Sequence, residues 1–244
     1  MSVSALTKKR LIKDITDLYH SPLEEQGIYY IHDESNMLRG YAMIKGPTDT
    51  PYEHGFYTFR FEFPTDYPHS PPTVIFTTGD GHMRFNPNLY VNGKVCLSIL
   101  NTWEGERWTS CQSIRTILLT LVTVLNENPL SNEPAYNHHK STMTECQNYI
   151  ALVKYKNIQV ALLSPFEKGL ATEYLHFMPH IVKYLRENRE KILKMVEMWK
   201  KEGMKSDSFT YREGMTVSIP YNYDCVLKFA NLFNRLQLVL ENIK

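Results

Sequence analysis

The sequence predicts an α+β fold, in which a helix and a four-stranded antiparallel meander precede several further helices. Residues 55–63 give the clearest strand, because Tyr57, Phe59 and Phe61 alternate with Thr58 and Arg60 along it. After residue 149 the apolar residues recur instead at the spacing of a helix. The change of period places the strands early in the chain and most of the helices late.

An amphipathic helix is expected near the start of the chain, because apolar residues recur there at helical spacing among basic ones. The apolar positions are Leu11, Ile12, Ile15, Leu18 and Tyr19. Four strands follow, bounded by glycine, proline and other turn residues. They are predicted over residues 27–32, 40–46, 55–63 and 73–78. Apart from the last strand, residues 64–105 are rich in proline and glycine and are expected to form an ordered loop.

Further helices are predicted from residue 114 onward. The first covers residues 114–125, and Thr109 with Gln112 forms a capping-box pattern ahead of it. Ser164, with a proline after it, marks another predicted helix start. The remaining helical patterns cover residues 149–163, 179–202 and 226–243. We expect a core domain over residues 5–155 and a helical C-terminal extension over residues 156–244, packed on the core.

Composition and charge argue against several classes of protein. The 244 residues include 27 basic and 26 acidic ones, so the net charge of +1 gives no long-range field for nucleic acid. No apolar run reaches the ~18 residues of a membrane span, and residues 1–14 lack the apolar core of a signal peptide. The cysteines form no C-x-x-C pair, which argues against a zinc site or a redox motif. We expect a protein of the cytoplasm and nucleus, with neither membrane nor nucleic acid as a partner.

The stretch NPNLYVNGKVCLSIL, residues 86–100, holds the strongest candidate for chemistry. Cys96 is its single cysteine, Asn88 lies eight residues earlier, and the stretch contains no histidine. Taken alone, such a cysteine is a buried apolar residue more often than a nucleophile. A cysteine hydrolase needs a histidine beside the thiol, so the stretch argues against a protease. Cys111, near a predicted helix start, is a second candidate nucleophile.

Several strings occur in the order found in one known family. They are GP at 46–47, PY at 51–52, FPTDYPHSPPTVIFTT at 63–78, NPN followed by CLSIL, and EP at 133–134. With them, residues 5–150 resemble the ubiquitin-conjugating enzyme family. The strings FNPN, GKVCLSIL and NENP, the pair Thr102–Trp103 and the helical extension are most similar to the branch called ubiquitin-conjugating enzyme Z.

The resemblance implies the ubiquitin-conjugating fold and a cysteine-dependent acyl transfer. Cys96 would accept ubiquitin or a ubiquitin-like modifier as a thioester from an activating enzyme, and would pass it to a substrate lysine or a ligase. Such a carrier needs no strong base on its thiol, because the modifier arrives already activated. The activating enzyme uses the ATP, so neither a bound cofactor nor a metal is expected. A catalytically inert ubiquitin-binding module is the alternative from another class.

The resemblance also gives roles to two other site residues. Asn88 would steady the oxyanion or the loop around it, although an asparagine after proline is also a common turn former. Glu133 would help the incoming lysine, or would be a solvated loop acid. The sequence departs from the family at Asn86, where a histidine is usual, and at Ser98, where an aspartate is common. Asparagine can replace the histidine's hydrogen bonds, whereas Ser98 leaves lysine activation more dependent on Glu133 or on a partner.

Two partner surfaces follow from the resemblance. Basic residues of the first helix would contact the activating enzyme, or would form a solvated face; they are Lys8, Lys9, Arg10 and Lys13. The loops that hold RING-type ligases depart from the family pattern, because His69 replaces a phenylalanine and the turn at 109–111 has no proline. A restricted set of ligases, or transfer with little help from a ligase, is therefore expected.

Overall fold

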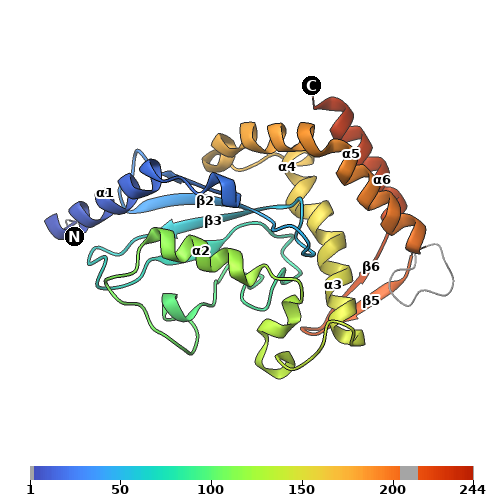
Figure 1. Cartoon of the computed structure of the whole chain (residues 1–244), viewed down its shortest axis with the longest axis horizontal. Coiled ribbons are helices and arrows are strands. Elements are labelled where there is room, and N and C mark those ends of the chain that lie inside the picture. Colours follow the sequence, from blue (N-terminus) through green and yellow to red (C-terminus); the bar gives the residue numbers. More distant parts are fainter. Residues whose placement is uncertain (1–2, 204–213, 244) are drawn as a thin grey trace. The chain divides into compact units, whose positions relative to one another are not determined.

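The computed structural model describes residues 3–203 and 214–243. Contacts divide the chain into two compact units, which are described one at a time (Figure 1). The first unit contains Met1–Pro47 and Tyr57–Asn126, and the second contains Thr48–Phe56 and Glu127–Lys244. The domain boundary expected between residues 155 and 156 stays a prediction.

The first unit contains the predicted helix and meander. Its elements are α1 (Ala5–His20), η1 (Glu24–Gln26), β1 (Ile28–His32), β2 (Arg39–Lys45), β3 (Phe56–Glu62), β4 (Thr73–Phe76), η2 (Ser98–Leu100) and α2 (Ile114–Val124). The strands lie in the order β1-β2-β3-β4, with β1 antiparallel to β2 and β3 antiparallel to β4. The predicted α+β meander is therefore confirmed, with each strand within two residues of its expected bounds.

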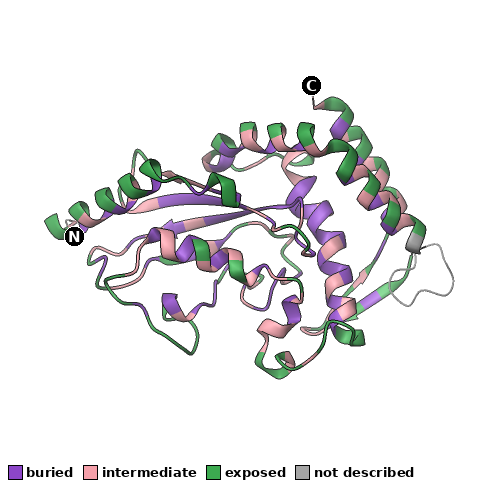
Figure 2. Cartoon of the chain, in the orientation of Figure 1, coloured by how far each residue is buried: buried purple, intermediate pink, exposed green. Residues whose placement is uncertain are grey.

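The alternation along β3 decides which of its faces the core covers. Tyr57, Phe59 and Phe61 are all buried, and the ring of Phe59 lies 5.4 Å from that of Phe76 on β4. Arg60 and Glu62 point to the other face, where they form a partly exposed ion pair at 3.1 Å. Because burial of one aromatic side chain stabilises a fold by about 2–3 kcal/mol, this face fixes the register of the strand. Figure 2 shows the resulting buried stretch of the sheet.

Helix α1 buries a different stripe from the one expected. Ile12 and Tyr19 are exposed, and the buried stripe includes the charged residue Asp14. The Asp14 carboxylate accepts a hydrogen bond from Arg10 Nε at 2.8 Å and another from the Tyr67 hydroxyl. Two such partners satisfy a carboxylate that would otherwise be strongly unfavourable away from water. The complete buried stripe is Thr7, Leu11, Asp14 and Leu18.

Replacement of Asp14 by alanine is expected to lower the free energy of unfolding by about 2–4 kcal/mol. The change leaves the buried hydroxyl of Tyr67 and the Nε–H of Arg10 without their acceptor. Chemical denaturation of the purified chain measures the effect. Asp17→Ala is the matched control, because Asp17 lies on the exposed face of the same helix. Equal stability of the two variants would show that Asp14 contributes nothing through these partners.

Helix α2 begins later than the predicted capping box places it. Ser113 is the N-cap, and it forms a capping box with Thr116. The expected pair does interact, since the Gln112 side chain accepts a hydrogen bond from the Thr109 backbone at 3.2 Å, but it closes a turn ahead of the helix. The prediction that Thr109 caps α2 is therefore wrong, although the apolar stripe starting at Ile114 is confirmed.

The second unit is mainly helical. Its elements are η3 (Pro129–Asn132), η4 (Pro134–Tyr136), α3 (Thr144–Lys156), the π-helical segment η5 (Asn157–Leu162), α4 (Ser164–Glu167), η6 (Thr172–Phe177), α5 (Met178–Gly203), β5 (Thr216–Ile219), β6 (Tyr223–Val226) and α6 (Phe229–Asn242). Helix α4 starts at Ser164 with a proline in its first turn, as predicted, although the Ser164 side chain makes no cap. The strands β5 and β6 form an antiparallel hairpin that the helical pattern did not predict.

Helix α3 is the central element of this unit, and Figure 2 shows it buried along much of its length. Phe229 at the start of α6 joins the helices, because its ring lies 5.4 Å from that of Tyr155 on α3 and 6.3 Å from that of Trp199 on α5. Glu167 and Arg235 add a paired ionic contact at 2.8 and 2.5 Å. The apolar stripes of the predicted extension are therefore buried against one another and against α3.

The loop Thr48–Phe56 belongs to this unit because Asn157 holds it. The side chain of Asn157 is fully buried and donates from Nδ2 to the carbonyl of Glu53 at 2.7 Å. The loop approaches so closely that a Cβ atom on Gly55 would lie 1.8 Å from Asn157 Oδ1. Residue 55 must therefore be glycine for this amide to keep its place.

Candidate active site

The stretch that contains Cys96 folds as a short loop anchored to β4. The backbone of Phe76 donates to the carbonyl of Gly93 at 2.8 Å, and Lys94 forms an isolated bridge with Ile75. Gly93 has a φ of 87°, and a Cβ atom there would lie 2.9 Å from the Phe76 carbonyl. Both the positive φ and the close carbonyl require glycine at this turn. Gly93 therefore determines where the loop reverses toward Cys96.

Asn88 and Cys96 lie opposite each other in this loop and are joined by two hydrogen bonds. The backbone of Cys96 donates to the Asn88 carbonyl at 2.9 Å, and Asn88 Nδ2 donates to the Cys96 carbonyl at 2.7 Å. The structure thus brings together the two residues whose spacing marked them as a pair. The second hydrogen of Nδ2 has no hydrogen-bond acceptor among the described residues, so it remains available to an oxygen atom placed beside Cys96.

Thr102 fixes the backbone on both sides of Cys96. Its hydroxyl donates to the carbonyl of Val95 at 2.8 Å and accepts a hydrogen bond from the backbone of Leu97 at 2.9 Å. Thr102 stood out in the sequence only as part of a family string, so this bracing role was not predicted. Its signal was a hydroxyl residue shortly after the cysteine, a pattern too common in loops to identify a contact.

The Cys96 side chain is enclosed in this conformation. The whole residue is 1% exposed, whereas Cys111 is exposed. A large modifier can therefore reach the Cys96 sulfur only if the groups around it move. The role of Cys96 as a nucleophile stays a prediction.

Asn86 carries out the structural task expected of it. It is fully buried, its Oδ1 accepts from the Asn88 backbone at 2.9 Å, and its Nδ2 donates to the Val124 carbonyl at 2.7 Å. An asparagine at this position therefore ties the loop to the end of α2.

Glu133 belongs to the second unit, whereas Cys96 belongs to the first. It occupies the junction of η3 and η4, and Pro134 follows it. Its Oε2 accepts a hydrogen bond from the hydroxyl of Tyr221 at 2.7 Å. Tyr221 lies 88 residues further along the chain, and no local pattern connected the two.

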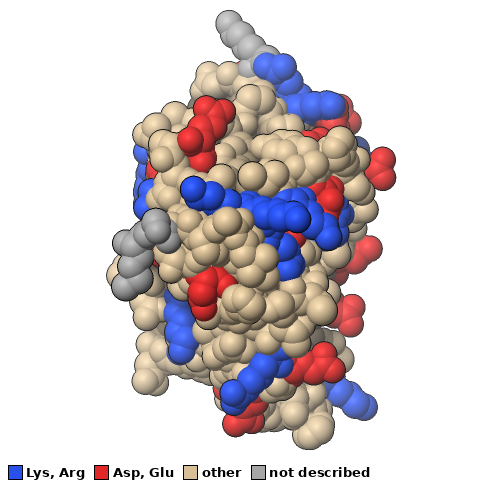
Figure 3. All heavy atoms as spheres, turned by 90° about the vertical axis from the view of Figure 1, so that its left-hand side faces the viewer, with Lys and Arg blue, Asp and Glu red and all other residues tan. Residues whose placement is uncertain are grey.

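The predicted basic surface on α1 is divided by the structure. Lys8, Lys9 and Lys13 are exposed, and Figure 3 shows Lys and Arg side chains gathered in a band across the face on which α1 lies. Arg10 is different, because its guanidinium bonds to Asp14 and to the backbone carbonyls of Ser110 and Gln112. The Arg10 guanidinium is therefore paired with groups of the protein itself. Of the four predicted basic residues, the three lysines remain exposed for contact with a partner.

The two loops considered for ligase contact are joined to each other. Trp108 Nε1 donates to the carbonyl of Pro68 at 2.7 Å, and the Ser110 hydroxyl donates to the same carbonyl at 3.2 Å. His69, next to Pro68, is exposed. The departures from the family pattern at residues 69 and 109–111 therefore lie on one small surface of the first unit.

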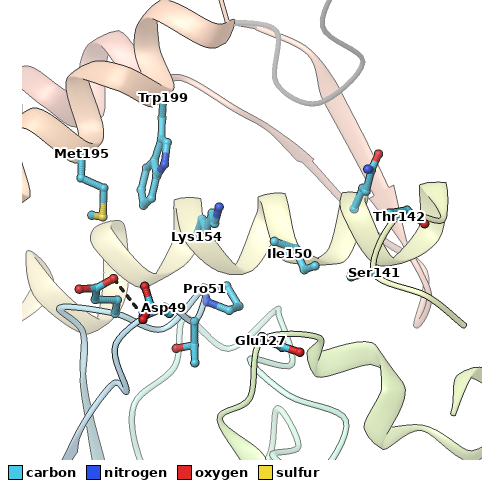
Figure 4. A pocket seen from close by; sticks show the side chains of 12 residues that line it. Asp49, Pro51, Glu127, Ser141, Thr142, Ile150, Lys154, Met195 and Trp199 are labelled. Atoms are coloured by element: carbon cyan, nitrogen blue, oxygen red, sulfur yellow. Dashed lines mark hydrogen bonds between the residues drawn. The ribbon is translucent and has the colours of Figure 1, made fainter.

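A cleft of about 600 Å³ lies in the second unit, beside α3 (Figure 4). Figure 4 shows Met195 and Trp199 of α5 directed toward α3, with Trp199 above Lys154. The Nζ atom of Lys154 lies 5.6 Å from the centre of the Trp199 ring. None of the candidate site residues lines this cleft.

No group of three or more His, Cys, Asp or Glu side chains is arranged to hold a metal ion within residues 3–203 and 214–243. Within the same ranges, no helix has the length and apolarity needed to cross a bilayer.

The loop geometry and the order of the motifs agree with the resemblance, and comparison with known proteins decides the family. The model for ubiquitin-conjugating enzymes matches residues 10–156, which is more than half of the chain. The chain belongs to the ubiquitin-conjugating enzyme family. The predicted fold, with the helix, the four-stranded meander and a C-terminal extension, is the one that this family membership requires.

Relatives place this ubiquitin-conjugating enzyme sequence near the Z branch. Ubiquitin-conjugating enzyme E2 Z of Xenopus tropicalis is 41% identical over 159 residues, which cover 65% of this chain and 50% of the relative. The human dual E2 ubiquitin-conjugating enzyme/E3 ubiquitin-protein ligase BIRC6 is 35% identical over 207 residues, 80% of this chain and 4% of the relative. The solved structure of human ubiquitin-conjugating enzyme E2 G1 is 31% identical, with a TM-score of 0.45, and covers 51% of this chain and 98% of its own. The predicted resemblance to the family and to its Z branch is confirmed.

Proposed function

We propose that this chain is a ubiquitin-conjugating transferase that carries a modifier as a thioester on Cys96. Family membership supports the proposal, and the paired hydrogen bonds between Asn88 and Cys96 are the observation that carries it. These bonds hold the cysteine beside a side-chain amide that has one N–H to spare. A carbonyl oxygen that becomes negative during acyl transfer is stabilised by a donor held in place in this way.

The charging step exchanges one thioester for another. The Cys96 thiolate attacks the carbonyl carbon that links the modifier to the activating enzyme's cysteine. A new C–S bond forms to Cys96, the old C–S bond breaks, and the activating enzyme's thiolate leaves. The enclosed position of Cys96 means that binding of the activating enzyme, or of the modifier's C-terminus, must open the loop.

The activating enzyme is proposed to contact three exposed cations of α1, which are Lys8, Lys9 and Lys13.

The discharge step forms an amide. The neutral amine of a substrate lysine attacks the thioester carbonyl, a C–N bond forms, and the C–S bond breaks. The amine loses one proton and the departing Cys96 sulfur can take one up, so the step needs no added cofactor. Asn88 would stabilise the oxyanion, and Glu133 would orient the amine and take up its proton in transit. Transfer to the cysteine of a ligase would use the same site without the amine.

The burial of Cys96 favours a second candidate, a catalytically inert module that binds ubiquitin without forming a thioester. An enclosed thiol that never opens is simply a small apolar core residue. The two candidates differ in one observable, which is a covalent adduct on Cys96.

A charging assay separates the two candidates. The chain is incubated with ATP, a panel of activating enzymes, and ubiquitin or a ubiquitin-like modifier, and the products are run on a non-reducing gel. We expect at least one combination to give a band shifted by the mass of the modifier and lost on addition of reductant. If no combination gives the band, while ubiquitin binds non-covalently in a calorimetric titration, the inert module is the correct function.

A further inference from the structure

We propose that Tyr221 is a positioning residue for Glu133 in the transfer of the modifier to lysine. The proposal rests on the proposed function, because it concerns the discharge step. Its basis is the hydrogen bond that the Tyr221 hydroxyl donates to Glu133 Oε2 at 2.7 Å. The C-terminal hairpin thereby contributes a contact to a residue of the candidate site.

The hairpin is held in place on α3, so the tyrosine is presented from a fixed support. Asn148 on α3 donates from its side chain to the carbonyl of Ser218 on β5 at 3.4 Å. The ring of Tyr221 itself packs edge-on against Tyr149 of α3, with 6.5 Å between centroids. Since Tyr149 is fully buried, Tyr221 has a rigid surface beneath its ring and its hydroxyl is directed to Glu133.

The backbone at Tyr221 indicates that the side chain itself is needed there. Tyr221 has a φ of 79° and Asn222 a φ of 54°, both in the left-handed region, within the three-residue loop between β5 and β6. Glycine adopts this conformation without strain, whereas a bulky side chain does so rarely. A tyrosine kept in an unfavourable conformation is common where its functional group has a task.

The contact restricts what Glu133 can do. One carboxylate oxygen is occupied by the tyrosine hydroxyl, and the side chain, which is only partly buried, loses most of its rotational freedom. The other oxygen, Oε1, is then presented in one direction, which suits an amine that must be oriented before it attacks. A free carboxylate on a loop would spend most of its time in other rotamers. Tyr221 therefore acts through Glu133 and touches no reacting atom.

The test is single-turnover discharge of the chain charged with the modifier found active in the charging assay. Free L-lysine and free L-cysteine serve as two alternative acceptors. Tyr221→Phe keeps the ring packing and removes only the hydroxyl. We expect its rate with lysine to fall roughly tenfold, less than the ~10²-fold that a misplacement of about 1 Å can produce. The rate with cysteine, a thiol that does not need Glu133, should stay within a factor of two of wild type, as a positioning role in amine attack requires.

Glu133→Gln and Tyr223→Phe complete the experiment. Tyr223 lies on the same hairpin, and Lys156 Nζ lies 5.8 Å from the centre of its ring, which phenylalanine retains, so its variant should behave as wild type. In the Glu133→Gln background, Tyr221→Phe should have no further effect on lysine discharge, because Tyr221 acts only through the Glu133 carboxylate. Failure of the wild type to charge overturns the proposed function and this inference together. If Glu133→Gln slows lysine discharge and Tyr221→Phe does not, or if both acceptors slow equally, the inference alone is wrong.

Discussion

Replacement of Cys96 by alanine is expected to abolish the thioester adduct, a loss of at least ~10⁴-fold in transfer rate. In the proposed mechanism the Cys96 sulfur holds the acyl group, and alanine offers no nucleophilic atom in its place. Cys96→Ser should instead give a slowly formed ester that survives reductant, because an alkoxide ester resists thiols. A non-reducing gel run with and without reductant measures both outcomes.

Cys111→Ala is the matched control for this prediction, because Cys111 is exposed and outside the loop. It should charge at the wild-type rate. A reductant-sensitive adduct that persists in Cys96→Ala and disappears in Cys111→Ala would move the nucleophile to Cys111. Mass spectrometry after brief alkylation compares the accessibility of the two thiols. In the uncharged protein, the exposed Cys111 should be alkylated before the enclosed Cys96.

Replacement of Asn88 by aspartate is expected to slow lysine discharge by about 10²–10³-fold, the usual effect of removing one oxyanion donor. Aspartate has the same shape, yet an ionised carboxylate cannot donate a hydrogen bond and repels a developing negative charge. The thioester should still accumulate when activating enzyme and ATP are supplied in excess. Single-turnover discharge after quenching of the activating enzyme measures the rate.

Asn86→Ala distinguishes catalysis from bracing of the loop. Asn86 is fully buried and holds the loop through Val124 and the Asn88 backbone, so its loss should lower the melting temperature and slow charging and discharge alike. If Asn88→Asp shows the same pattern as Asn86→Ala, with equal effects on both steps, then Asn88 supports the loop and stabilises no oxyanion.

The sequence predicted best those features whose cause is local. The strand β3 was readable because alternation of large and polar residues follows directly from the geometry of a strand. The pairing of Asn88 with Cys96 was indicated by the family resemblance, whose spacing these two residues match. The family strings then supplied the chemistry that eight residues of spacing alone do not define.

Features that depend on distant partners were missed. The burial of Asp14 was not predicted, because Tyr67, which makes it possible, lies 53 residues away in sequence. The hairpin β5–β6 has two strands of only four residues each, and their burial depends on α3. The sequence of the hairpin alone therefore showed only a break in the helical pattern. The predicted cap of α2 failed for a different reason, since the Thr109–Gln112 pattern closes a turn of its own and Ser113, four residues later, caps the helix.

The bond from Asn157 to the carbonyl of Glu53 has a consequence for biosynthesis, because it spans 104 residues of sequence. The ribosome makes the chain from its N-terminus, so the loop Thr48–Phe56 emerges long before the amide that holds it. During that interval the segment is unanchored, and early folding of the meander must proceed around it. Completion of the second unit then depends on contacts of high sequence separation, which form slowly.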